Sequence, residues 1–227
     1  MIDHRTPNIK YFSIGLPKMM TYDNDYEMVT GICKEATEEV YLTKDGFQGD
    51  GVADLQFHGG VDRAVCIYPY EHYLLWEQEF GQTLAPAAFG ENLTLTNMLE
   101  CDVNIGDIYQ VGDAVIQISQ GRNPCSTINK RTNLPLLLKR IIETGYTGYL
   151  CRVIEEGKVR RDSKITLLEQ HPKQVSILFG NQVYFHSLHG QEGFDRLLDV
   201  PELAEKWRDS LIKRFNKQSL INQESTG

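Results

Sequence analysis

The residue best suited to chemistry in this chain is Cys125, which closes the run Ser119-Gln120-Gly121-Arg122-Asn123-Pro124-Cys125. Residues 113–118 are predicted to form a buried strand, so the thiol would lie just beyond a strand end. Pro124 restricts the backbone around it and thereby the direction of the thiol. Arg122 carries a permanent positive charge that favours a thiolate, the form that attacks electrophiles or binds metals. A buried structural cysteine fits the same pattern, because free cysteine is among the most buried residue types.

Two further windows place polar side chains beside glycines. In the stretch from Phe57 to Arg63, Gly59 and Gly60 allow backbone N–H groups to approach an anion, and His58 and Arg63 add donors. In the stretch 89–93, Asn92 offers both a donor and an acceptor, as the edge of a pterin or an amide requires. Taken singly, each window is also typical of an ordinary turn.

The bulk composition is that of a soluble globular protein. Hydrophobic residues make up 41% and charged residues 24% of the 227 positions. The net charge of −8 argues against nucleic acid or an anionic membrane as the main partner. No apolar run approaches the roughly 18–20 residues that span a bilayer, and the sequence shows no signal-peptide pattern. We therefore expect a cytoplasmic protein that uses neither nucleic acid nor a membrane as partner.

The cysteines do not form a recognisable framework. Their number is odd, they are widely spaced, and no C-x-x-C pair occurs, which argues against a disulfide scaffold or a zinc ribbon. Reduced thiols are the expectation for a cytoplasmic protein. The five cysteines are Cys33, Cys66, Cys101, Cys125 and Cys151.

The first two-thirds of the chain is predicted to be rich in β-structure. Short runs with β-branched or aromatic residues alternate with turn sequences such as Lys44-Asp45-Gly46. Many short strands at close spacing favour a sandwich or barrel over a parallel α/β sheet. The predicted strands cover residues 27–33, 38–43, 64–68, 104–111, 114–119, 150–154 and 158–168.

Two helices are predicted to interrupt these strands, at 69–80 and 135–144. Each begins with a proline and stops before a glycine, which is typical of helix ends. After residue 172 the pattern becomes helical, with helices predicted at 173–178, 191–198 and 201–217. We therefore predict a β domain over residues 1–170, a small three-helix domain over 171–219 and a disordered tail over 220–227.

Taken together and in order, these windows resemble the MOSC domain family. The order is His-Gly-Gly-x-Asp-Arg at 58–63, Tyr-Pro-Tyr-Glu-His-Tyr at 68–73, Gly-Glu-Asn-Leu-Thr at 90–94, Gly-Asp-Ile-Tyr at 106–109 and the motif that ends at Cys125. The chain resembles the YiiM-like branch, in which a three-helix extension follows the MOSC domain. This resemblance covers about residues 14–217 and implies a mainly β (α+β) pseudo-β-barrel with interspersed helices. Gly121 stands where relatives often have proline, which is expected to loosen the approach to Cys125.

The resemblance further implies that the chain binds the molybdenum cofactor, molybdopterin, in which a pterin dithiolene holds the metal. Cys125 matches the family's proposed molybdenum ligand, and soft thiolates suit such a metal. His58 is also a candidate catalytic residue that relays a proton, since its ordinary pKa is near neutral. The cofactor-binding residues that the resemblance implies are His58, Gly59, Arg63, Asn92, Ser119, Arg122 and Asn123.

By the same resemblance, the expected activity is a detoxifying reduction of N-hydroxylated compounds, such as N-hydroxylated purine bases, to amines by oxygen-atom abstraction at molybdenum. The chain has no flavin or nicotinamide motif, so an external reductase is expected to supply the electrons. Two alternatives are a non-catalytic cofactor carrier and a sulfur-handling protein. In a third, Cys125 is purely structural. A homodimer is compatible with the sequence, which does not decide the oligomeric state.

Overall fold

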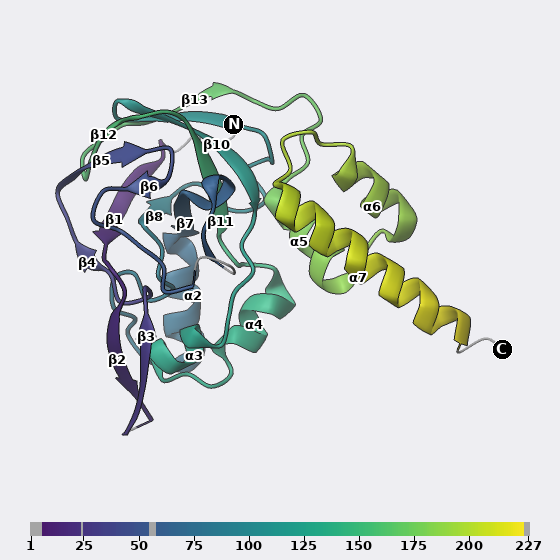
Figure 1. The fold of residues 1–227 in the computed structure, drawn as a ribbon, viewed down its shortest axis with the longest axis horizontal. Helices are drawn as coiled ribbons and strands as arrows, with labels where there is room; N and C mark the ends of the chain where they lie inside the picture. The colour runs from purple at the N-terminus through teal and green to yellow at the C-terminus, as the bar shows by residue number, and fades with distance from the viewer. Residues whose placement is uncertain (1–5, 24, 55–57, 225–227) are drawn as a thin grey trace.

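One long curled sheet forms the body of the protein (Figure 1). The computed structural model describes residues 6–23, 25–54 and 58–224. In spatial order the strands are β13 (Ile165–Glu169), β9 (Ile108–Val111), β10 (Ala114–Gly121), β11 (Tyr149–Glu155), β7 (Val65–Pro69), β8 (Leu93–Thr96), β1 (Asn8–Ile14) and β4 (Glu35–Ala36). Neighbouring strands are antiparallel, except that β7 and β8 are parallel. The sheet curls into a half-barrel, which confirms the prediction of a mainly β, barrel-like α+β fold.

Two smaller sheets complete the β-structure. Strands β12 (Gly157–Arg160), β5 (Glu39–Thr43) and β6 (Gly46–Phe47) pair side by side and contribute buried side chains to the same core as the long sheet. Strands β2 (Lys18–Tyr22) and β3 (Tyr26–Thr30) form an antiparallel hairpin that extends from the body (Figure 1).

Three helices lie at the end of the body nearest this hairpin (Figure 1). They are α2 (Tyr70–Phe80), α3 (Thr127–Thr132) and α4 (Leu137–Thr144). Helix α2 follows Pro69 and ends at Gly81, whose φ of 66° suits the left-handed position after a helix. Trp76 of α2 and Leu137 of α4 are fully buried in one aromatic cluster with Tyr68 and Phe89. The predicted helices at 69–80 and 135–144 are thus confirmed, whereas α3 was not predicted.

The C-terminal part is helical and packs against one side of the sheet (Figure 1). Its helices are α5 (Ile177–His186), α6 (Gly190–Leu198) and α7 (Glu205–Glu224). The first was predicted at 173–178 and begins later, because Ser176 caps it by accepting a hydrogen bond from the Phe179 N–H at 3.1 Å. Helix α7 continues through residue 224, into the stretch predicted as a disordered tail, and residues 225–227 lie outside the described residues.

Two predicted strands also needed correction. The segment 158–168 is two strands, β12 and β13, which pair with different neighbours on either side of a turn. Ser163 stabilises that turn, because its hydroxyl accepts the Arg160 N–H at 2.8 Å. The strand predicted at 104–111 is shorter, because the Asp107 carboxylate accepts the Asn104 N–H at 2.9 Å and holds residues 104–107 in a turn.

Within the described residues, none of the helices is both long enough and apolar enough to cross a membrane.

Candidate functional site

The Cys125 loop, residues 122–125, leaves the end of β10 and enters α3. Strand β10 is almost entirely buried, and its last residue, Gly121, pairs with Tyr149 of β11. Cys125 itself is a half-buried free thiol, and its carbonyl accepts the Ile128 N–H at 3.1 Å as α3 begins. The thiol therefore lies just beyond a buried strand end, as the sequence predicted.

Arg122 joins the Cys125 loop to the loop that precedes β8. Its backbone N–H donates to the Gly148 carbonyl at 3.1 Å, and its Nη2 donates to the Phe89 carbonyl. Burial by itself lowers the pKa of Arg122, but the nearby Cys66 and Cys125 sulfurs raise it on balance. Its Nη1 is buried and has no hydrogen-bond partner among the described residues. One donor of a fully charged group is thus left for a ligand.

A buried carboxylate holds the loop at 87–92, to which Arg122 is bound. Glu91 accepts hydrogen bonds from the Tyr73 hydroxyl, from Thr94 Oγ1 at 2.6 Å and from the Phe89 N–H at 3.2 Å. Gly90 has a φ of 76°, and a Cβ there would lie 2.8 Å from Ile32 Cγ1. Gly90 therefore allows this loop to lie close against Ile32.

Asn92, a predicted cofactor-binding residue, is occupied by contacts within the protein. Its Oδ1 accepts the Cys66 N–H at 3.0 Å, and its Nδ2 donates to Asp50 Oδ2 at 2.9 Å and to the Ser13 carbonyl at 3.4 Å. The residue is buried, with 3% of its surface exposed. In this geometry Asn92 connects β1, β7 and the loop around Asp50.

Sequence reasoning missed an ion pair between Lys34 and Asp50. Lys34 Nζ contacts Asp50 Oδ1, and the two side chains are only 4% and 12% exposed. Asp50 also accepts the Gly15 N–H at 2.8 Å and the Asn92 amide. No local pattern links the two residues, because each stands in an ordinary polar loop sequence.

The Lys34 charge also acts at Cys66. Burial raises the pKa of the Cys66 thiol, while the charges of Arg122 and Lys34 oppose that rise. Cys66 and Cys125 thus both lie near Arg122. Arg122 therefore has a second thiol near it in addition to the predicted one.

The predicted window at 58–63 lies close to the Cys125 loop. The 3-10 helix η1 (Val61–Arg63) follows Gly60, whose φ is 120°, and Gly59 is half-buried. Arg63 Nε donates to Gln120 Oε1 at 3.3 Å, one residue before the end of β10. Loss of solvation lowers the pKa of the His58 ring, and the charges of Arg122 and Arg63 lower it further. His58 therefore shares its surroundings with both arginines; Phe57 lies outside the described residues.

Two other predicted site residues make structural contacts. Ser119 is fully buried, and its hydroxyl lies 2.6 Å from the Asp62 carbonyl and 2.8 Å from the Leu150 carbonyl. Asn123 is exposed, but its amide is hydrogen-bonded to α5 and α7. Ser119 thus links β10 to η1 and β11, and Asn123 links the Cys125 loop to two C-terminal helices.

Positive charge lies close to the two thiols, because Arg122 is near both Cys66 and Cys125 and Lys34 acts at Cys66. Arg122, Arg63 and Lys34 lie in three different segments of the chain, and Asp50 is hydrogen-bonded to Lys34. The neighbouring Asp62 is bound to Arg152, with Nε and Oδ1 2.7 Å apart. Such a site suits an anionic ligand that also accepts a soft sulfur donor.

Both parts of the chain match known protein domains. Residues 54–166 match the MOSC domain, and residues 175–218 match the YiiM-like, 3-alpha helix domain. The protein YflK of Bacillus subtilis is 40% identical over 206 residues, which are 90% of this chain and 93% of that protein. The crystal structure of YiiM from Geobacillus stearothermophilus superposes with a TM-score of 0.76 at 33% identity, covering 92% of this chain and 99% of the other.

A third relative is a fungal protein with a functional name. A protein of Gibberella moniliformis named "Reductase" is 38% identical over 157 residues. The match covers 67% of this chain and 28% of that larger protein.

Proposed function

We propose that this protein, which belongs to the MOSC domain family and carries the YiiM-like three-helix domain, is a molybdenum-cofactor-dependent oxidoreductase that reduces small N-hydroxylated compounds to amines. Membership in the family associates the chain with the molybdenum cofactor. The observation that carries the proposal is the free Nη1 donor of Arg122 beside the half-buried thiol of Cys125.

The residues present fit such a cofactor. The orphaned Arg122 Nη1, together with Arg63, suits the phosphate of an anionic pterin, and Cys125 offers a thiolate to a metal that prefers sulfur. Cys125 would therefore be the protein's ligand to molybdenum, and Arg122 and Arg63 would hold the phosphate. Bound there, the group would supply the two electrons and the oxygen-accepting metal that cleavage of an N–O bond requires.

The side chains of this chain have separate tasks in that reaction. Arg122 stabilises an anionic sulfur at Cys125 through its charge. The reduction R–NHOH + 2 e⁻ + 2 H⁺ → R–NH₂ + H₂O breaks the N–O bond and consumes two protons. His58, whose pKa is lowered, is neutral at pH 7 and can carry a proton on a ring nitrogen between solvent and substrate. The electrons would come from a separate reductase, because the sequence carries no flavin or nicotinamide motif.

The name of the fungal relative supports reduction over simple storage of the cofactor. Storage requires only that the cofactor be held, whereas reduction also needs a proton path and an exchange of electrons. His58 beside two arginines provides a group for the first requirement.

The test is an anaerobic assay of the cofactor-loaded protein with an N-hydroxylated purine base and reduced viologen as electron donor. We expect amine formation by the natural protein, measured by chromatography, and a loss on the order of 10–100-fold or more in Cys125→Ala, as for a lost metal-site contact. Cys101→Ala is the matched control, because Cys101 is exposed and makes its contact with Asp102 elsewhere.

Bound cofactor without amine formation would contradict reduction and favour a carrier. Equal loss in Cys125→Ala and Cys101→Ala would contradict the role given to Cys125.

A further inference from the structure

The three-helix part contacts the end of β10 and the Cys125 loop at several successive positions. The Ala204 N–H donates to the Ser119 carbonyl at 3.0 Å. Asn181 of α5 lies against Gly121, and the Asn123 side chain is bound by α5 and α7. Residues 119, 121 and 123 therefore each contact the C-terminal part of the chain.

The contact at Gly121 leaves no space for a side chain. A Cβ at this position would lie 2.0 Å from Asn181 Oδ1. Asn181 is fully buried and cannot easily withdraw, because its Nδ2 donates to the Gly145 carbonyl at 2.7 Å and to Thr147 Oγ1 at 2.9 Å. The sequence had suggested that Gly121 loosens the approach to Cys125, but here the glycine permits close packing of α5 on the strand end.

The Asn123 amide has a defined orientation. The Trp207 indole can only donate, so the oxygen it contacts at 3.0 Å is Asn123 Oδ1. The amide nitrogen then donates to the Tyr184 hydroxyl at 3.1 Å. That hydroxyl lies 3.0 Å from Ser210 Oγ, to which it can donate its own proton. The hydrogen bonds thus run in one direction, from Trp207 of α7 through Asn123 and Tyr184 of α5 to Ser210 of α7.

The two aromatic side chains that bind Asn123 are themselves fixed. Their rings stack with centroids 4.8 Å apart and an interplanar angle of 9°. Trp207 is fully buried, and the Arg214 guanidinium lies over the Tyr184 ring at 4.8 Å. A side chain at Gly180 would come within 3.3 Å of Trp207. The helical part thus presents a rigid pair of polar groups to the loop.

We infer that Trp207 and Tyr184 are positioning residues that set the place of the Cys125 thiol through Asn123. Only Pro124 separates Asn123 from Cys125. Because the φ of a proline is fixed, a displacement of Asn123 also moves the Cys125 thiol. The inference deepens the proposed function, because it gives the three-helix domain a task at the same site. It concerns the loop in the protein without cofactor, so it can be tested separately.

The test measures how fast iodoacetamide modifies Cys125 in the full-length, cofactor-free protein, by mass spectrometry of its peptides. Asn123→Ala and Trp207→Phe each release the loop, so we expect Cys125 to react roughly fivefold faster, the effect of one lost hydrogen bond of about 1 kcal/mol. The modification rate of exposed Cys101 serves as an internal standard for the activity of the reagent in the same sample. Asn123→Asp keeps an acceptor for Trp207 and should stay within about twofold of the natural rate.

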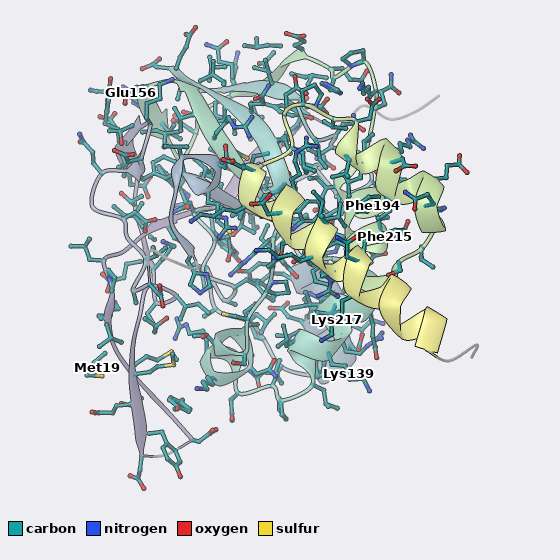
Figure 2. The ribbon with its side chains drawn as sticks, turned by 45° about the vertical axis from the view of Figure 1, so that its right-hand side comes forward. Met19, Lys139, Glu156, Phe194, Phe215 and Lys217 are labelled. Carbon is teal, nitrogen blue, oxygen red and sulfur yellow. The ribbon has the colours of Figure 1, made fainter. Side chains whose placement is uncertain are left out.

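Phe194→Leu is the matched control for general loosening of the helical part. Phe194 of α6 stacks on Phe215 of α7 at 4.1 Å, on a part of the helices that does not contact Asn123 (Figure 2). Thermal unfolding establishes that all four variants are folded at the assay temperature. An unchanged or lower Cys125 rate in Asn123→Ala and Trp207→Phe, or an equal rise in Phe194→Leu, would overturn the inference.

Molybdenum content of the same variants provides a second readout. We expect occupancy to fall in Asn123→Ala and Trp207→Phe but not in Phe194→Leu. If the natural protein binds no molybdenum, the proposed function fails while the thiol rates still decide the inference.

Discussion

Arg122 connects the Cys125 loop to two other parts of the candidate site. It holds the Cys125 loop to Gly148 through its backbone and to Phe89 through its guanidinium, and its charge acts on two thiols. Burial raises the pKa of its neighbour Cys66. The two thiols should therefore react differently with alkylating reagents.

We expect iodoacetamide at pH 7.5 to modify Cys125 before Cys66, and modification of Cys66 to rise only at a pH above the ordinary range for a thiol. The raised pKa keeps the Cys66 thiol protonated, and therefore unreactive, to higher pH. In Arg122→Gln, which removes a charge that opposes the rise in the Cys66 pKa, Cys66 should react several-fold more slowly.

Lys139→Gln controls for the change in net charge. Lys139 is 70% exposed on α4, where it pairs with Glu143 at 3.7 Å (Figure 2). Cys66 reacting first in the natural protein, or Lys139→Gln slowing Cys66 as much as Arg122→Gln, would contradict this account.

At the residue scale, associations between residues close together in the sequence could be predicted. Arg122 and Cys125 stand three positions apart, so their association could be read from the motif. The pair of Lys34 and Asp50 could not, because folding brings together two loops that carry no shared pattern. Asn92 was predicted as a ligand from its chemistry, and that prediction is untested, but its amide is used to join three segments.

At the scale of elements, the loop at 87–92 determines where Arg122 can bind. Its shape depends on buried Glu91 and on Gly90, which lies against Ile32 in a left-handed conformation. The Phe89 ring in this loop stacks on Tyr68 of β7 at 3.9 Å, which ties the loop to the centre of the sheet.

We expect Gly90→Ala to destabilise the protein by about 2–4 kcal/mol, since an unfavourable φ and a steric clash add. Gly81→Ala is the matched control: its φ of 66° is similar, but a Cβ there meets no atom within 4 Å. Urea unfolding measures both, and the control should lose only about 1 kcal/mol. Equal losses would show that the contact with Ile32 does not hold the loop.

Some helices and strands could be predicted from the sequence, whereas others could not. Proline and glycine marked both ends of α2, and β-branched runs marked β7, β10 and β11. Helix α3 has only six residues, too few for a periodic apolar pattern. The start of α5 depends on the Ser176 cap, a signal that was present in the sequence but was outweighed by the pattern before it.

At the scale of the whole molecule, the two matched domains act on one loop. The Cys125 loop begins at the end of β10 in the sheet, and α5 and α7 of the C-terminal part form hydrogen bonds with Asn123 in this loop. The amphipathic pattern of residues 201–217 predicted a helix and its buried Trp207 face. It could not predict that the indole N–H would bind Asn123, because that contact joins residues 84 positions apart.

The measurement that tests the central claim most directly is the molybdenum and pterin content of the anaerobically purified protein, compared with Cys125→Ala. We expect nearly one molybdenum and one pterin per chain in the natural protein, and loss of the metal in the variant, because the thiolate is the chain's ligand to it. Neither metal nor pterin in the natural protein, even after reconstitution with intact cofactor, would contradict the claim.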